Sequence, residues 1–341
     1  MLLHSQVPAR VDLAGGTLDI WPLYLFHPGA QTINFAINCY ARCRVSVRRD
    51  KVIEMISHDL RRRESFPSFQ TLKKAKRLRL PLLGRLVMAF EPTTGLTIET
   101  DSEAPAGSGL GGSSALNIAI CGALGRLSGK RMPATKMIEL ACNVEAQVIG
   151  IPTGEQDYYS AVYGGLQAIH LTPHGVQAEK LPVDAHELSA RFVLCYTGQS
   201  RASALNNWEV FKAHVDGKNG VIRHFDRIAA IAGAMRQVLL EKDWKQVATL
   251  LDQDWQARKK NYPGITTAKI ERLIATARRH GALAAKACGA GGGGCVVFLV
   301  EPEAKLKVEE ALRRMGARIL LFHVEHRGLR VQATKFPNRY L

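Results

Sequence analysis

The chain has 341 residues, of which 46% are hydrophobic and 22% charged, a globular composition that is long enough to bury a large core and to divide into two domains. No apolar run approaches the length of about 18 residues that spans a bilayer, and the N-terminus lacks the pattern of a secretory leader, so we expect a cytoplasmic protein without membrane contact. The formal charge of +16 favours an anionic partner but does not choose among nucleic acid, an acidic membrane face and a phosphorylated small molecule.

The first hundred residues are predicted to be rich in strands, because residues 42–49 and 95–100 alternate apolar with polar side chains. Between Arg48 and Arg85 lie twelve basic residues and four acidic ones. A solvated basic surface is the simpler interpretation. A platform for nucleic acid normally interleaves aromatic side chains for stacking, and this stretch has only Phe66 and Phe69. We therefore expect no nucleic-acid partner.

The segment "PAGSGLGGSSA" (105–115) holds four glycines and three serines in front of a helix that we expect from Ser114 to Gly129. Glycines let backbone N–H groups converge, and a helix N-terminus favours an anion, so the segment is a candidate phosphate site. A plain strand-to-helix turn, with Ser113 or Ser114 capping the helix, is the alternative. A P-loop is excluded because its lysine is missing, and a Rossmann fingerprint because its acidic residue is missing.

A second helix is expected from Pro133 to Gly150. The segment "IPTGEQDYYSAVYGG" follows, and Asp157 stands there after a Pro-Thr-Gly turn, from which its carboxylate can project into a cleft or cap a short helix. Short strands are expected at 164–171 and 190–197.

Beyond Thr197 the pattern is largely helical, with helices expected at about 204–240, 243–259, 266–280 and 303–315. "GAGGGG" (289–294) runs into an apolar strand, and further strands are expected at 317–324 and 328–333. With "LAGG" (13–16) and the loop at 105–115, this cluster suggests several glycine loops closing on one ligand, although a turn at a sheet edge would also explain it. We expect an α+β fold of two domains, residues 1–195 and 196–341.

The seven cysteines form no close metal-ligand set in the sequence, and most lie among apolar residues. Their odd number indicates a reducing compartment.

Three ordered segments resemble the motifs of the GHMP kinases, the family of galactokinase, homoserine kinase and mevalonate kinase. They are "PARVDLAGGTLDIW", "PAGSGLGGSSA" and "KACGAGGGGCVVFL", spread over residues 8–300. The resemblance implies an N-terminal domain like the second domain of ribosomal protein S5 and a ferredoxin-like C-terminal domain. ATP and the acceptor would meet in the cleft between them.

Two further segments, "PTGEQDYYSAVYGGLQAI" and "YTGQSRASA", resemble the branch that phosphorylates the anomeric hydroxyl of a sugar, and are most like the D-glycero-D-manno-heptose 7-phosphate kinases, with the fucose kinases next. Glu145 and Asp157 are spaced as in galactokinases, whereas mevalonate kinases have one residue fewer. The resemblance implies ATP, Mg²⁺ and a sugar or sugar phosphate as partners. A galactokinase-like or fucokinase-like enzyme for an unphosphorylated sugar, or a non-catalytic regulator, are the alternatives, and a homodimer remains open.

The resemblance also assigns roles to residues. Asp157 would orient the acceptor hydroxyl or take its proton, and Arg10 would keep Asp157 ionised. Ser113 and Glu145 would hold Mg²⁺, while Ser114 would cap the helix. Residues assigned to ATP are Gly107, Ser108, Gly109, Leu110, Gly111, Gly112, Ser113, Ser114, Gly291 and Gly292.

On the sugar side the resemblance assigns Asp19, Gly16 and Thr17, and Arg201 would receive a phosphate that the sugar already carries. Asp19 as a loop cap and Arg201 as a surface residue are the alternatives. The chain reads "GGTLD" where heptose kinases tend to read "GGGTD", and "GLGGSSA" where they tend to read "GLGSSSA", so Thr17 and Gly112 depart from the pattern. The first departure alters the sugar pocket.

Overall fold

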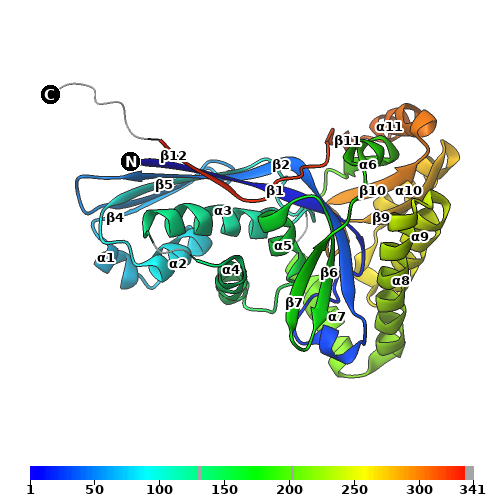
Figure 1. Cartoon of the computed structure of the whole chain (residues 1–341), viewed down its shortest axis with the longest axis horizontal. Helices are drawn as coiled ribbons and strands as arrows, with labels where there is room; N and C mark the ends of the chain where they lie inside the picture. The colour runs from blue at the N-terminus through cyan, green and yellow to red at the C-terminus, as the bar shows by residue number, and fades with distance from the viewer. Residues whose placement is uncertain (130–131, 201–202, 335–341) are drawn as a thin grey trace.

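The computed structural model describes residues 1–129, 132–200 and 203–334. Its strands form two sheets, and helices pack against both; the longest strands of the first sheet, β1 and β2, extend toward the second sheet (Figure 1). Hydrophobic side chains from both parts form the core. Among the described residues, no helix is long and apolar enough to cross a bilayer.

The first sheet has the strand order β12-β1-β2-β5-β3-β4, and β6 pairs with both β2 and β7. All pairings are antiparallel except that of β3 with β5. Strand β2 pairs with β1 and, in addition, with β6 along its first part and with β5 along its second part. The strands are β1 (Leu2–Ala14), β2 (Gln31–Val47), β3 (Ile53–Ser57), β4 (Arg62–Phe66), β5 (Leu96–Ser102), β6 (Leu166–Thr172), β7 (Gly175–Lys180) and β12 (Arg330–Thr334).

Helix α3 (Gly112–Leu127) is the central helix of this part. It is buried on most of its circumference, because it contacts β1 and β2 on one side and α2, α4 and α5 on others. The small residues Ala119, Gly122 and Ala123 allow this close packing. The other helices here are α1 (Phe69–Lys73), α2 (Pro81–Phe90), α4 (Ala134–Ile149), α5 (Gln156–Tyr163) and α6 (Ala185–Arg191).

The second sheet is antiparallel and has the order β11-β8-β10-β9. Amphipathic helices cover it, as in α10, where Ile270, Leu273, Ile274 and Ala277 form one buried face at helical spacing. The elements of this part are β8 (Phe192–Tyr196), α7 (Ser203–Val215), α8 (Val221–Glu241), α9 (Trp244–Lys259), α10 (Ala268–Arg279), β9 (Ala282–Ala287), β10 (Cys295–Val300), α11 (Lys305–Arg314) and β11 (Arg318–Ile319). Short 3-10 helices lie at Leu23–Phe26, between β1 and β2, and in this part at Lys218–Gly220, Pro263–Ile265 and Pro302–Ala304.

The helix expected from Pro133 to Gly150 is confirmed as α4, with those two residues as its caps. Two expectations about secondary structure are wrong. The helix expected at 204–240 is divided into α7 and α8, because the chain turns at Gly217 and Gly220, which both have positive φ. The strand expected at 317–324 is reduced to β11, because beyond Ile319 the backbone pairings are isolated ones, from Leu320 to Leu194, from His323 to Asn38 and from Val324 to Ile37.

The domain boundary expected near residue 195 falls inside β8, which pairs with β10 and so belongs to the second sheet. Strand β12, near the other end of the chain, pairs with β1 in the first sheet. The division into 1–195 and 196–341 stays a prediction. All seven cysteines are described and are free thiols.

Candidate functional site

One cavity brings together most of the side chains that the sequence singled out. Its volume is about 430 Å³. It is lined from β1 and the N-terminal loop (residues 15–19), from the glycine loop (residues 105–112), from the first turns of α3 and α5, and from the C-terminal glycine loop (residues 288–294). The predicted site residues that line it are Arg10, Gly16, Thr17, Asp19, Gly107, Ser108, Gly109, Gly111, Gly112, Ser113, Ser114, Glu145 and Asp157.

The glycine loop ends in the N-terminus of α3. Helix α3 begins at Gly112, and its N-cap Gly111 has φ of 71° and no side chain to cap the helix. The N–H groups of the first turn therefore have no acceptor within the helix, and together with the helix dipole they favour an anion in the cavity. Gly109 permits the loop to touch its C-terminal counterpart, because a Cβ there would lie 2.4 Å from the carbonyl oxygen of Cys288.

Ser114 does not cap the helix, so this expectation is wrong. It lies in the first turn of α3, buried, and its hydroxyl donates to Glu145 Oε2 at 3.0 Å. The cap position belongs to Gly111, three residues earlier, where the lack of a side chain leaves the N–H groups open to a ligand.

Glu145 is a buried carboxylate on α4, 7% exposed. Asn117 donates to Glu145 Oε2 at 3.1 Å, and the Tyr158 hydroxyl also donates to it. Burial raises the pKa of Glu145, while hydrogen bonds from Tyr158, Ser113 and Ser114 act to lower it. Within the described residues no Lys or Arg forms an ion pair with Glu145, so a buried acid faces the cavity with neutral donors alone. A hydroxyl and a carboxylate placed beside a phosphate site fit the oxygen ligands of Mg²⁺.

Asp157 and Arg10, which both line the cavity, form an ion pair. Arg10 Nε lies 2.6 Å from Asp157 Oδ1, and Arg10 Nη1 donates to the Gly109 carbonyl oxygen at 2.6 Å. The Arg10 N–H also donates to the carbonyl oxygen of Leu110, whose side chain packs in the core rather than in the cavity. One arginine thus holds both the glycine loop and the carboxylate.

The position of Asp157 explains why Gly111 is needed. A Cβ at Gly111 would lie 2.9 Å from Asp157 Cγ, so the carboxylate packs directly on the glycine loop. Burial raises the pKa of Asp157 more than Arg10 lowers it. The expected ion pair with Arg10 is present, and the pKa of Asp157 is shifted upward overall, which strengthens the carboxylate as a proton acceptor.

Asp19 is a third buried carboxylate that lines the cavity. Its Oδ1 accepts the Thr17 N–H at 3.1 Å and its Oδ2 accepts the Gln156 N–H at 3.0 Å. Burial and the charge of Asp157 raise the pKa of Asp19 to about 6. The N-terminal loop and the start of α5 are thus joined through this side chain.

Three of the predicted residues that the structure describes, Leu110, Gly291 and Gly292, are not among those that line the cavity. Gly291 and Gly292 lie against Ile265, whose carbonyl oxygen accepts the Gly292 N–H at 2.6 Å, and Gly289 and Ala290 line the cavity instead. Arg201 lies outside the described residues. Their assignment to nucleotide and sugar stays a prediction.

A buried charge cluster beside the cavity was missed by the sequence reasoning. Lys286 Nζ lies 3.0 Å from Asp12 Oδ2 and 2.6 Å from Asp254 Oδ2, and Arg258 Nη1 lies 3.4 Å from Asp12 Oδ2. Burial acts to raise the pKa of Asp12, but the charges of Lys286, Arg10 and Arg258 hold it well below its ordinary value. Two sequence signals were available. Lys286 interrupts an apolar strand, and Asp254 and Arg258 are four residues apart on one helix face.

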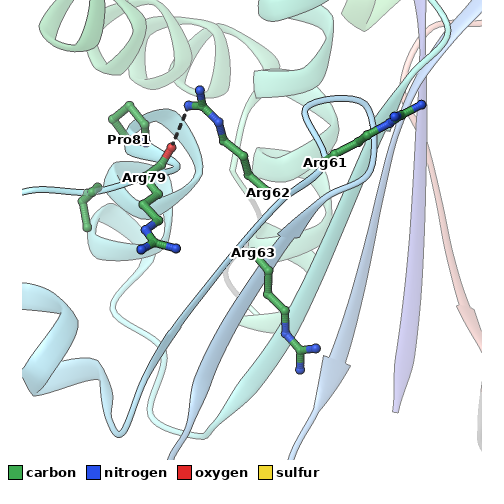
Figure 2. Close-up of a pocket in the computed structure, with 6 residues that line it drawn as sticks. Arg61, Arg62, Arg63, Arg79 and Pro81 are labelled. Atoms are coloured by element: carbon green, nitrogen blue, oxygen red, sulfur yellow. Dashed lines mark hydrogen bonds between the residues drawn. The ribbon is translucent and has the colours of Figure 1, made fainter.

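The basic segment noted in the sequence forms a second hollow of about 490 Å³, lined by Arg61, Arg62, Arg63, Leu78, Arg79 and Pro81. It adjoins the first cavity, which Leu60 and Leu82 line. Figure 2 shows that its guanidinium groups point in different directions, with Arg62 donating to the Arg79 carbonyl oxygen at 3.4 Å. Exposed like charges repel and take such divergent positions.

Comparison with known proteins identifies the fold. The family model described as the GHMP kinases N terminal domain matches residues 72–165, and the one described as GHMP kinases C terminal matches residues 235–318. Together they match just over half of the chain.

Relatives extend the likeness over nearly the whole chain. A D-glycero-alpha-D-manno-heptose 7-phosphate kinase of Campylobacter jejuni is 28% identical over 96% of this chain and 98% of its own. A mevalonate kinase of Pyrococcus horikoshii is 25% identical over 96% and 97%. The crystal structure of a D-glycero-D-manno-heptose 1-phosphate kinase from Bacteroides thetaiotaomicron matches with a TM-score of 0.77 and 25% identity, over 98% of this chain and 99% of that one. The predicted α+β fold is confirmed, and the chain belongs to the GHMP kinases, a family that uses ATP as phosphate donor, on its sugar-kinase branch.

Proposed function

We propose that the chain transfers the γ-phosphate of ATP to the anomeric C1 hydroxyl of D-glycero-D-manno-heptose 7-phosphate. The relative from Campylobacter jejuni, similar over almost the full length of both chains, supports this substrate. The observation that carries the chemistry is the position of Asp157. Its carboxylate is paired with Arg10 and packs on Gly111, next to the helix N-terminus that favours phosphate.

Phosphoryl transfer requires mainly that the reactants are held in line and that charge on the moving group is neutralised. In the proposal, the N–H groups of residues 107–114 hold the phosphates. Asp157 orients the acceptor hydroxyl and takes its proton, which its raised pKa favours. Arg10 is a permanent cation beside the transferred group.

Mg²⁺ would be held by Ser113 and Glu145. A bound Mg²⁺ neutralises phosphate charge and keeps most of its own water. The buried carboxylate of Glu145, which has only neutral donors around it among the described residues, supports this role. The hydroxyl of Ser113 is exposed to the cavity, as a ligand would require.

Asp19, Gly16 and Thr17 would contact the sugar. They line the cavity, and Asp19 offers carboxylate oxygens to sugar hydroxyls. Arg201 would receive the 7-phosphate, a role that bidentate guanidinium geometry suits.

The substitution Asp157→Asn tests the mechanism. We expect turnover to fall by at least about 100-fold, because the proton acceptor is lost, while the Kd of a non-hydrolysable ATP analogue stays within about two-fold of the wild type. Asp252→Asn, on the far face of α9, is the matched control and should leave turnover unchanged. Unchanged turnover in Asp157→Asn would remove Asp157 from the mechanism.

A substrate panel tests the acceptor. ATP consumption is measured with heptose 7-phosphate, unphosphorylated heptose, fucose, galactose and mevalonate, and we expect turnover with the first. Turnover with unphosphorylated sugars alone would support a galactokinase-like or fucokinase-like enzyme. Binding of the ATP analogue without turnover on any member would support a non-catalytic regulator.

A further inference from the structure

Arg258 contacts two loops that line the cavity. It lies in the last turn of α9 and is 2% exposed. Its Nη2 donates to the Gly289 carbonyl oxygen at 2.6 Å and to Thr17 Oγ1 at 3.3 Å. Thr17 belongs to the N-terminal loop and Gly289 to the C-terminal glycine loop, and both residues line the cavity. One buried guanidinium therefore contacts both loops at once.

The N-terminal loop depends on this contact. Thr17 has φ of 80°, a left-handed conformation that strains a β-branched residue and persists only where its surroundings hold it. The Thr17 hydroxyl accepts from Arg258, and the Thr17 N–H donates to Asp19. The loop also packs tightly on the same guanidinium, because a Cβ at Gly16 would lie 3.4 Å from Arg258 Nη1 and 2.8 Å from Asp12 Oδ2.

The C-terminal glycine loop is held by the same cluster. The Gly289 N–H donates to Asp12 Oδ1 at 3.0 Å, and its carbonyl oxygen accepts from Arg258. Gly289 in turn packs on Gly109 of the glycine loop, since a Cβ at Gly289 would lie 2.8 Å from Gly109 Cα. A shift of Gly289 would therefore move the glycine loop (residues 105–112), which holds the phosphates in the proposed function.

We propose that Arg258 is a positioning residue that couples sugar binding at the N-terminal loop to nucleotide binding at the glycine loops. The inference rests on the proposed function, in which the sugar meets Thr17 and Asp19 and the nucleotide meets the glycine loops. A ligand that orders Thr17 also orders Arg258, and Arg258 in turn orders Gly289. The second ligand then binds a site that is already ordered, so it loses less conformational entropy. Such coupling is reciprocal, and each ligand tightens the other by the same factor.

Calorimetry measures this factor. The Kd of β,γ-imido-ATP with Mg²⁺ is determined with and without heptose 7-phosphate, and the Kd of the sugar with and without the analogue. We expect each ligand to tighten the other by about five-fold or more in the wild type. In Arg258→Lys, which keeps the charge but loses the fork of donors, the factor should fall to within about two-fold of one.

Thr17 variants separate the coupling from a merely structural role. Thr17→Val removes the accepting hydroxyl at nearly constant shape and should also lose the factor. Thr17→Ser keeps the hydroxyl and should restore it. Arg278 on α10 forms an exposed ion pair with Asp252 on α9, the helix that carries Arg258. Arg278→Lys is therefore the control, and it should keep the wild-type coupling factor. Thr17→Val decides the matter if Arg258→Lys fails to fold.

The outcomes distinguish the two proposals. If the wild type binds both ligands and Arg258→Lys and Thr17→Val keep its coupling factor, the coupling is wrong and the proposed function stands. If the wild type binds both ligands independently, the coupling is wrong as well. If the wild type binds the analogue but not heptose 7-phosphate, the proposed substrate is wrong, and the coupling falls with it.

Discussion

Three carboxylates around the cavity, those of Asp19, Glu145 and Asp157, share one property. Burial raises the pKa of each, and the fixed cations nearby do not fully offset it. Arg10 is committed to Asp157, and Lys286 and Arg258 are committed to Asp12. Among the described residues, Asp19 and Glu145 form no ion pair with a Lys or Arg, as expected of a site whose ligands bring Mg²⁺ and hydroxyl donors with them.

The raised pKa of Asp19 predicts a pH dependence of stability. Its pKa of about 6 lies above the ordinary 3.8, so the folded chain holds a proton that the unfolded chain has released. The stability that this group contributes is fully present below pH 4 and is lost as the pH rises through 6. A shift of this size corresponds to about 3 kcal/mol.

Urea unfolding at pH 4.5 and pH 7.5 measures this effect, with Asp19→Asn as the comparison. The wild type should lose more free energy of unfolding between the two pH values than Asp19→Asn does, by about 2 kcal/mol. The difference between the two chains cancels the titration of groups that they share. Equal losses in both chains would show that Asp19 has an ordinary pKa.

At the scale of elements, α3 shows what the sequence could predict. Its apolar spacing and its end near Gly129 were readable, and so was α4 between Pro133 and Gly150. Its start was placed at Ser114 because serine is a common N-cap, whereas the observed N-cap, Gly111, carries no side chain to reveal it. The division between α7 and α8 was missed because Gly217 and Gly220 lie within one continuous helical pattern.

The two ends of α3 give a matched pair of glycines for the next prediction. Gly109 before the helix and Gly129 after it both have positive φ, so alanine costs both of them backbone strain. They differ in the space that is available for a Cβ atom. A Cβ at Gly109 would lie 2.4 Å from a backbone oxygen of the C-terminal glycine loop, whereas nothing lies within 4 Å of one at Gly129.

We therefore expect Gly109→Ala to force the two glycine loops apart and to weaken binding of the ATP analogue by at least about ten-fold, a loss of about 1.4 kcal/mol. Gly129→Ala should lose about 1 kcal/mol of stability and keep the wild-type affinity. Calorimetry gives the affinities and urea unfolding gives the stabilities. Wild-type affinity in Gly109→Ala would show that the contact between the loops does not shape the phosphate site.

At the scale of the whole molecule, the buried cluster of Asp12, Asp254, Arg258 and Lys286 ties the two sheets together. Asp12 lies on β1 of the first sheet, Lys286 on β9 of the second, and Asp254 and Arg258 on α9. Sequence motifs located the glycine loops and the pair of Arg10 and Asp157. Lys286 and the pair of Asp254 and Arg258 are visible in the sequence as separate signals, but no motif joins them to Asp12, which lies 246 residues before Arg258 and meets it only in the fold.

Lys286 carries the last prediction. It is fully buried between Asp12 and Asp254, so Lys286→Met leaves two carboxylates with Arg258 as their remaining cation in the cluster. Breaking a buried ion pair on one side typically costs about 3–5 kcal/mol, far more than the 0–1 kcal/mol of an exposed pair. We expect Lys286→Met to lower the free energy of unfolding by about 3–5 kcal/mol. Arg278→Met, at the exposed pair with Asp252, should lower it by about 0–1 kcal/mol.

The double variant Lys286→Met with Asp254→Leu removes one charge of each sign, so it should recover much of the loss, because Arg258 is then left to balance Asp12. Urea unfolding of the four chains gives the coupling directly. If the double variant loses as much free energy of unfolding as its two single variants together, charge balance does not stabilise the junction. The packing of the Lys286 stem between β1 and α9 would then be what stabilises it.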